Sequence, residues 1–246
     1  MSGAAVLLVT ACQPANTPAA ADPDDFSALV SDPRTVTQIP ADVASGNATA
    51  EDVTKSYLDR IAAVDDAGPK LNAVIAINPN AVANAAALDQ LKAGGVVRGP
   101  LHGVPILIKD NIESADPMPT TAGSLALQDN LTNRDSPLVA RLRGAGAVIL
   151  GKTNLSEWAN FRSNASTSGW SAVGGQTKNP HVLDRNPCGS SSGSGSAVAA
   201  GLAAAAIGTG AEGSVLCPSS PNGIFGTKPT RRLLDMGFKV VATAGT

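Results

Sequence analysis

The sequence predicts an α/β fold, a mixed, mostly parallel twisted sheet covered by helices on both faces. Helical patterns alternate closely with short apolar runs, which is the rhythm of a sheet with crossover helices. The chain is 43% hydrophobic but only 3% aromatic, so we expect an aliphatic core of Ala, Val, Leu and Ile. We find no internal repeat and no later linker, and therefore expect one domain over residues 26–246.

Residues 1–25 form a separate segment. "MSGAAVLLVTAC" is an apolar run too short to span a bilayer, and it ends in small residues before a cysteine, as export signals do. Residues 9–12 resemble a bacterial lipobox, in which Cys12 would be lipidated and would tether the protein to a membrane. Residues 13–25 are rich in Pro, Ala and Asp and predict a disordered tether. We expect an exported, periplasmic or cell-envelope lipoprotein; the alternative is an ordinary apolar N-terminus on a cytoplasmic protein.

Two helices and a strand are predicted in the first part of the domain. Thr49 is placed to cap the first helix, with Asp52 three residues on, and apolar residues recur at helical spacing as far as Val64. Residues 84–95, "NAAALDQLKAGG", predict the second helix, which its two final glycines close. The apolar run in "GVPILIKDNI" predicts a buried strand that ends at residues 109–110.

A further helix and strand follow in "DSPLVARLRGAGAVILGKTN". Ser136 is placed as the helix cap, Pro137 takes the first helical position and Gly144 stops the helix. Residues 147–150 then predict a strand. Later in the chain, "AVAAGLAAAAIGTG" is suited to a buried helix and another short strand.

Charge, histidine and cysteine content exclude several classes of function. Lys and Arg number 18 against 20 Asp and Glu, so no basic face is evident and nucleic acid is not an expected partner. With only His102 and His181, a multi-histidine metal site is excluded, and we expect no metal or cofactor. Three cysteines are too few for a disulfide framework. No histidine is placed by the sequence to activate Cys188 or Cys217, so both are interpreted as small, buried packing residues.

Eight consecutive Gly and Ser residues, 189–196, are the most unusual stretch. A flexible linker is the usual meaning of such a run, but too few residues follow for a second domain. A phosphate-binding Walker loop is excluded, because Ser194 and Gly195 stand where it needs Lys and then Ser or Thr. Residues 189–193 match the G-x-S-x-G nucleophile elbow, but no strand precedes them and no histidine follows residue 181.

The Gly/Ser run becomes informative together with other motifs. Over about residues 50–230 the chain resembles amidase signature enzymes, and within that family it is most similar to the peptide amidase branch. The resemblance implies the amidase signature fold, incomplete at the C-terminus. The stretches that carry it are "RGPLHGVPILIKDNI" (98–112), "TTAGSLAL" (120–127), "GAVILGKTNLSEWANFR" (146–162), "GGQTKNP" (174–180), "PCGSSSGSGSAVAAG" (187–201) and "GSVLCPSSPNGIFGTKPT" (213–230).

The resemblance implies a Ser-Ser-Lys triad. Lys109 falls on the base, Ser190 on the bridging serine and Ser214 on the nucleophile, and the 24 residues from one serine to the other agree with the family pattern. It also implies a cis peptide bond between Gly189 and Ser190. Lysine acts as a base only when it is neutral, so we expect burial to favour the uncharged amine. The Gly/Ser run is then a catalytic loop.

These roles imply an amidase that converts a linear carboxamide to carboxylate and ammonia through an acyl-enzyme. The expected substrate is a small-molecule or peptide amide, above all the C-terminal amide of peptides, and no obligate protein partner is evident. The turn "AEGS" is expected to offer the N–H groups of Ala211, Glu212, Gly213 and Ser214 to the oxyanion. Supporting roles are expected for Gly189, Ser191, Asp110 and Thr209.

The sequence departs from the family pattern in three ways. Gly210 stands where the family usually carries an acidic residue, which could loosen the oxyanion turn. After "TKPT" the residues run off-pattern, as after a frameshift or truncation, and family chains are considerably longer. We therefore expect exposed strand edges and a half-open core.

Two alternative functions stay open. One is a catalytically inactive remnant or binding module that keeps the triad but cannot shape a substrate pocket. The other is an amidotransferase component that acts on charged tRNA with the same chemistry. The export-like N-terminus and Leu216, where many other branches carry Arg, weigh against the second.

Overall fold

The computed structural model describes residues 34–229 and 238–241. Cys12 and the rest of segment 1–25 lie outside the described residues, so the export signal, the lipid and the tether stay predictions. Among the described residues, no helix is both long enough and apolar enough to cross a bilayer.

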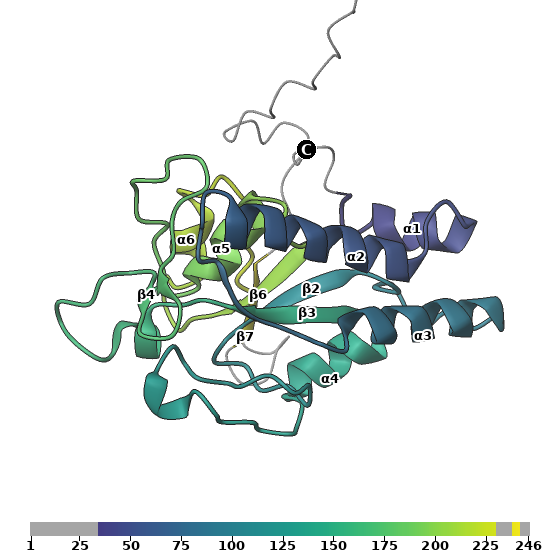
Figure 1. Ribbon diagram of the computed structural model, residues 1–246, viewed down its shortest axis with the longest axis horizontal. Helices are drawn as coiled ribbons and strands as arrows, with labels where there is room; N and C mark the ends of the chain where they lie inside the picture. The colour runs from purple at the N-terminus through teal and green to yellow at the C-terminus, as the bar shows by residue number, and fades with distance from the viewer. Residues whose placement is uncertain (1–33, 230–237, 242–246) are drawn as a thin grey trace, which may run out of the picture.

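A five-stranded sheet lies at the centre of the fold (Figure 1). Its three middle strands are parallel and lie in the order β3 (Val148–Thr153), β2 (Pro105–Lys109) and β6 (Ala205–Thr209). β1 (Val74–Ile77) pairs antiparallel with β3, and β7 (Phe238–Val241) pairs antiparallel with β6. Every residue of β2 and β3 is buried, as expected of parallel strands covered by helices. The predicted mixed, mostly parallel sheet is confirmed.

The predicted helix caps are present. Thr49 Oγ1 accepts a hydrogen bond from the N–H of Asp52 at the start of α2 (Ala50–Arg60), which follows the short helix α1 (Gln38–Ser45). The predicted helix continues past α2 as a π-helical segment, Ile61–Ala67. Ser136 Oγ accepts from Val139 at the start of α4 (Pro137–Gly144). The predicted second helix is α3 (Ala81–Ala93).

The smaller elements of the fold are irregular or short. Two of them are 3-10 helices, Leu125–Leu127 and Glu157–Asn160, and two form a small hairpin, β4 (Trp170–Ser171) and β5 (Gly175–Gln176). In Figure 1, α1, α2, α5 and α6 are drawn above the central strands, and α3 and α4 below them.

The Gly/Ser run is partly helical rather than a loop throughout. Helix α5 (Ser192–Ala199) begins inside it, and α6 (Leu216–Ser219) follows β6. The glycines permit this, because a Cβ at Gly193 would overlap the carbonyl oxygen of Ala73, and one at Gly195 would lie 3.0 Å from that of Pro218. The helix therefore packs with its backbone against its neighbours.

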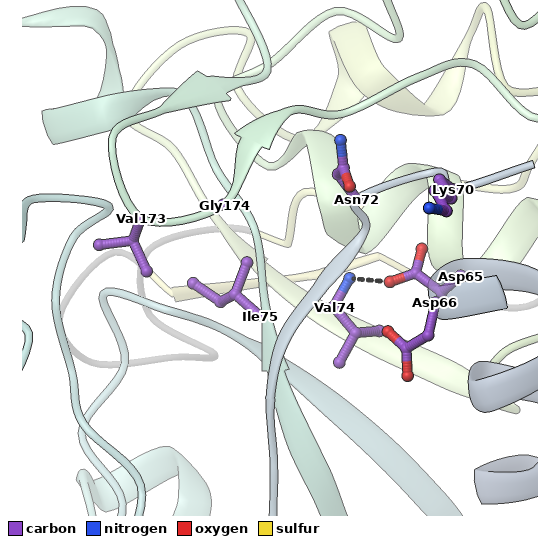
Figure 2. Close-up of a pocket in the computed structure, with 8 residues that line it drawn as sticks. All are labelled: Asp65, Asp66, Lys70, Asn72, Val74, Ile75, Val173 and Gly174. Carbon is purple, nitrogen blue, oxygen red and sulfur yellow. Dashed lines mark hydrogen bonds between the residues drawn. The ribbon is translucent and has the colours of Figure 1, made fainter.

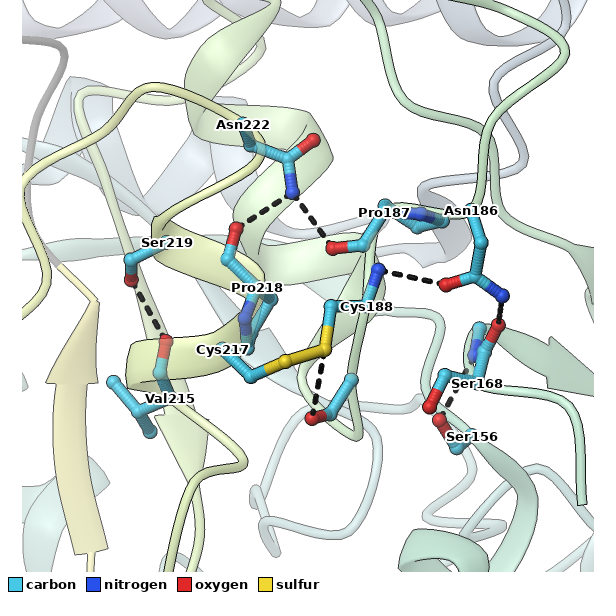
Figure 3. The surroundings of a disulfide bond; sticks show 12 residues. Ser156, Ser168, Asn186, Pro187, Cys188, Val215, Cys217, Pro218, Ser219 and Asn222 are labelled. Carbon is cyan, nitrogen blue, oxygen red and sulfur yellow. Dashed lines mark hydrogen bonds between the residues drawn. A yellow bond between two sulfur atoms is a disulfide. The ribbon is translucent and has the colours of Figure 1, made fainter.

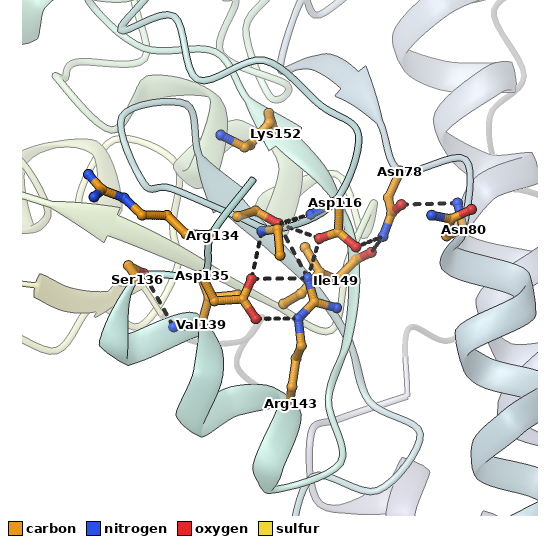
Figure 4. Close-up of polar contacts among 12 residues, drawn as sticks. Asn78, Asn80, Asp116, Arg134, Asp135, Ser136, Val139, Arg143, Ile149 and Lys152 are labelled. Carbon is orange, nitrogen blue, oxygen red and sulfur yellow. Dashed lines mark hydrogen bonds and ion pairs between the residues drawn. The ribbon is translucent and has the colours of Figure 1, made fainter. Parts of the chain in front are cut away.

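A partly buried polar cluster fixes α4 to the chain after β2 (Figure 4). Arg143 of α4 forms ion pairs with Asp116 and, at 2.9 Å, with Asp135. Asn78 Nδ2 donates to the other oxygen of Asp116 at 2.9 Å. The chain that leaves Lys109 at the end of β2 is thus held on a fixed path.

The expected exposed edge is absent at β6. Its residues 206–209 pair with residues 238–241 of the off-pattern tail, which form β7. Strand pairing uses backbone groups, so a short stretch with β-branched residues can pair with β6 even though its sequence departs from the family pattern. The two edge strands of the described sheet are β1 and β7.

Candidate active site

Lys109 lies at the carboxyl end of β2, beside the ends of its two parallel neighbours. Its side chain is fully buried. Its Nζ donates hydrogen bonds to Ser190 Oγ at 2.8 Å and to the carbonyl oxygen of Thr209, the last residue of β6, at 3.1 Å. The carboxyl ends of parallel strands are where open α/β sheets place their ligands. The predicted base and bridging serine are therefore in direct contact.

The burial of Lys109 changes its protonation. Removal of the amine from water lowers its pKa from 10.5 to about 7. Within the described chain, no charged neighbour opposes this shift. A substantial fraction of Lys109 is consequently neutral at neutral pH, which is the state that a general base requires.

Ser190 is held from both sides. It is fully buried, and the Gly189–Ser190 bond is cis, as the resemblance implied. Its carbonyl oxygen accepts from the N–H of Ser156 at 3.0 Å. A Cβ at Gly189 would overlap Ser156 Oγ and lie 2.7 Å from Ser192 Oγ, so glycine is required by this close approach. Gly189 thus lets the chain pass close to two serine side chains, and its supporting role stays a prediction.

Ser214 lies in the turn between β6 and α6 and is half-buried. Its carbonyl oxygen accepts from the N–H of Ser191 at 3.1 Å, which brings the predicted nucleophile turn against the residue after Ser190. Within the described part of the chain, no hydrogen bond joins the side chains of Ser214 and Ser190. The structure thus places Lys109 and Ser190 in contact, and joins Ser214 to them through the backbone.

Ser191 and Thr209 tie the serine loop to β6. Ser191 Oγ donates to the carbonyl oxygen of Thr209 at 3.1 Å and accepts from its N–H at 3.2 Å. Asn111 Nδ2 donates to Thr209 Oγ1 at 2.9 Å. Asn111 is a site residue that the sequence reasoning missed, although its place directly after Lys109 and Asp110 was a usable signal.

Asp110 turns away from Lys109 and pairs with a second buried lysine, Lys152, at 3.3 Å. Its other oxygen accepts from the N–H and the hydroxyl of Thr121. Lys152 Nζ also donates to the carbonyl oxygen of Ile112 and to Thr120 Oγ1, both at 2.8 Å. Burial raises the pKa of Asp110 and lowers that of Lys152, while each charge opposes the shift of the other. Asp110 and Lys152 together hold the loops around residues 112 and 120–121. The sequence reasoning had not singled out Lys152.

The predicted oxyanion turn is open on one side. Ala211, Glu212 and Gly213 are exposed. Within residues 34–229 and 238–241, the N–H groups of Glu212, Gly213 and Ser214 have no hydrogen-bond acceptor. A Cβ at Gly210 would lie 2.7 Å from Ser214 Cβ, so this turn needs glycine where the family usually has an acidic residue.

The interpretation of Cys188 and Cys217 as buried packing residues is wrong. The two form a disulfide with their Cα atoms 5.8 Å apart, and Cys217 is exposed while Cys188 is half-buried (Figure 3). The bond links the segment that leads into Ser190 to the segment that follows Ser214. The cysteines are 29 residues apart in the sequence, with α5 and β6 between them, so only the folded chain brings them together.

One described pocket lies apart from these residues. It has a volume of about 300 Å³ beside β1, and Asp65, Asp66, Lys70 and Asn72 are among its lining residues (Figure 2). Burial raises the pKa of Asp65 to about 6. The hydrogen bonds that its carboxylate accepts from the N–H groups of Ala73 and Val74 oppose this rise. None of the predicted triad residues lines this pocket.

Fold and site together define a class of protein: an α/β protein in which a buried lysine is hydrogen-bonded to a serine at the carboxyl ends of its parallel strands. Within this class the chain belongs to the amidase family, whose model, described as "Amidase", matches residues 52–235.

Individual relatives show the same likeness. A putative amidase of Schizosaccharomyces pombe is 44% identical over 80% of this chain and 33% of its own length. A glutamyl-tRNA(Gln) amidotransferase subunit of Acidothermus cellulolyticus is 43% identical over 80% of this chain and 37% of its own. This chain therefore spans about a third of the length of the curated relatives that it matches.

Solved structures give a closer likeness than these sequences. The native peptide amidase from Stenotrophomonas maltophilia and a peptide amidase in complex with the competitive inhibitor chymostatin are both 56% identical. Each has a TM-score of 0.76 and covers 77% of this chain and 39% of the solved chain.

Proposed function

We propose that the protein is an amidase that hydrolyses a linear carboxamide to a carboxylate and ammonia through a Ser-Ser-Lys triad. The observation that carries the proposal is the buried Lys109 amine, with a pKa of about 7, at 2.8 Å from Ser190 Oγ. A buried lysine without a carboxylate partner is costly to keep charged, and its lowered pKa suits proton transfer.

We infer the acylation step from these contacts together with the role that the family resemblance implies for Ser214. The Ser214 hydroxyl attacks the carboxamide carbon while its proton passes to Ser190 Oγ, and the Ser190 proton passes to the neutral amine of Lys109. The carbonyl oxygen of Thr209 keeps one amine N–H engaged, so the lone pair is left for Ser190. The developing negative charge on the carbonyl oxygen is stabilised by the open N–H groups of the turn 212–214.

Release of the amine reverses the same path. Ser190 gives a proton to the leaving nitrogen and recovers one from Lys109, so that ammonia departs and an ester on Ser214 remains. Water then attacks the ester and loses its proton through Ser190 to Lys109. Collapse of the second intermediate releases the carboxylate and restores the Ser214 hydroxyl.

The C-terminal amide of peptides is the substrate that we propose. The two peptide amidase structures are 56% identical to this chain, and one of them binds the inhibitor chymostatin. A tRNA-dependent amidotransferase component is the second candidate, supported by the 43% identity to the relative of Acidothermus cellulolyticus. The higher identity favours the peptide amidase.

Ammonia release from a peptide amide tests the function. We expect release by the wild-type chain, and none by Ser214→Ala or Lys109→Met, while Ser220→Ala, an exposed serine close by, serves as the control. Release from glutamine but not from the peptide amide would favour the amidotransferase. A folded wild-type chain that releases ammonia from neither would favour the inactive remnant.

We also propose export and lipidation at Cys12. The lipobox-like residues 9–12 support it, and so does the Cys188–Cys217 disulfide, because disulfides persist in oxidising compartments. Expressed in a bacterial host, the wild-type protein should partition into the detergent phase and carry a lipid by mass. Cys12→Ser should be unlipidated; a wild-type protein without a lipid would contradict the proposal.

A further inference from the structure

Lys228, after α6, reaches back to the turn that carries Ser214. Its Nζ donates to the carbonyl oxygen of Ala211 at 2.7 Å and to that of Glu212 at 3.3 Å. The next carbonyl, of Gly213, accepts from the N–H of Cys217 at 2.7 Å. Three consecutive carbonyl groups of the turn are therefore engaged, two of them by one ammonium group.

Peptide geometry converts this contact into a direction for the N–H groups. The only cis bond among the described residues is Gly189–Ser190, so the peptides after Ala211 and Glu212 are trans. In a trans peptide the carbonyl and the N–H point in opposite directions. Because Lys228 holds the two carbonyls, the N–H groups of Glu212 and Gly213 are directed away from it. These two N–H groups belong to the proposed oxyanion hole.

We propose that Lys228 is a positioning residue that orients and polarises the oxyanion hole. The inference rests on the proposed amidase function and assigns Lys228 no contact with the substrate. Ala211, Glu212 and Gly213 are exposed, and glycine at position 213 permits other backbone conformations, so the Lys228 contacts select one orientation of the turn. A cation on the carbonyl side also draws electron density away from the opposite N–H groups, which strengthens them as donors.

The effect of Lys228 should appear in the transition state rather than in substrate binding. The oxyanion forms only during attack, so a weaker hole lowers kcat and leaves KM nearly unchanged. Loss of a direct oxyanion donor costs about 10²–10³-fold in kcat. Since Lys228 acts on the donors from behind, we expect Lys228→Met to lower kcat by about 10- to 100-fold. Lys228→Arg should recover most of the activity, because it keeps the charge and the donors.

Lys92→Met is the matched control. It makes the same chemical change in the last turn of α3, and should leave kcat, KM and thermal stability unchanged. If Lys228 had a purely structural role, Lys228→Met would instead lower the stability of the protein, and an assay at lower temperature would restore its kcat. Equal kcat for Lys228→Met and wild type would overturn the inference.

A second measurement separates orientation of the hole from substrate binding. A peptide aldehyde forms a hemiacetal with the nucleophilic serine, and its oxygen takes the oxyanion position, whereas the matching peptide alcohol has no such oxygen. Lys228→Met should weaken binding of the aldehyde by the same factor as it lowers kcat, and leave binding of the alcohol unchanged. Equal weakening of both would overturn the inference. If Ser214→Ala keeps wild-type activity, the proposed function itself fails, which is a different result.

Discussion

Lys109 and Lys152 show that burial alone does not set the state of a lysine. Both side chains are fully buried, and burial lowers the pKa of both. Carboxylates oppose the shift at Lys152, and Asp110 pairs with it directly. Lys109 has a hydroxyl and a carbonyl oxygen as partners and, within the described chain, no compensating charge. Lys152 is thus paired with a carboxylate, while Lys109 lacks such a partner and is available as a base.

The pKa of Lys109 predicts the pH dependence of acylation. Because the neutral amine is the active form and its pKa is about 7, kcat/KM for a peptide amide should rise about tenfold per pH unit below 7 and level off above it. Steady-state rates between pH 5 and 9 check this, with thermal unfolding as a control for loss of fold. A profile that stays flat through pH 6–8 would contradict the assignment of Lys109 as base.

The same pKa predicts a pH dependence of stability. Between pH 7 and 10.5 the unfolded chain holds a proton on Lys109 that the native state lacks, so the free energy of unfolding rises with pH across this window. The full difference is roughly 5 kcal/mol. Lys109→Met should abolish this rise, and Lys92→Met should keep it. Denaturant unfolding at pH 7 and pH 10 measures the difference; an equal rise for wild type and Lys109→Met would refute the depressed pKa.

At the level of elements, local signals were predictable and distant contacts were not. The cap at Thr49, the helix from Pro137 to Gly144 and the strand ending at Lys109 follow from short-range patterns, and the structure contains all three. The start of α5 inside the Gly/Ser run was missed, because its glycines are selected by close packing rather than by helix propensity. The contacts of Lys109 with Ser190 and of Lys152 with Asp110 span 81 and 42 residues, so a family resemblance could supply the first and nothing local supplied the second.

The disulfide joins the segments next to Ser190 and Ser214, and the buried side-chain amide of Asn222 also connects these two segments. Asn222 Nδ2 donates to the carbonyl oxygens of Pro187 at 3.0 Å and Pro218 at 2.6 Å, each next to one of the cysteines (Figure 3). We expect reduction, or Cys188→Ala with Cys217→Ala, to lower stability by about 2–4 kcal/mol. The kcat should fall as well, since Ser214 loses a restraint relative to Ser190.

A thiol titration with activity assays checks this expectation. Cys12→Ser treated with the same reductant is the control for effects of the third cysteine, and reoxidation should restore activity. A reduced protein with unchanged unfolding midpoint and unchanged kcat would show that the bond has no positioning role.

At the scale of the whole molecule, we expect the pairing of β6 with β7 to stabilise the protein and to keep it from self-associating. β6 supplies Thr209 to the site, and residues 238–241 occupy the edge that would otherwise present unpaired N–H and carbonyl groups. Deletion of residues 230–246 should therefore lower the thermal midpoint and promote self-association through the freed edge. Deletion of residues 242–246 alone keeps β7 and should leave both properties unchanged. Light scattering and thermal unfolding of the two truncated chains decide the matter, because a stable, monomeric 1–229 chain would mean that β7 does not protect the sheet.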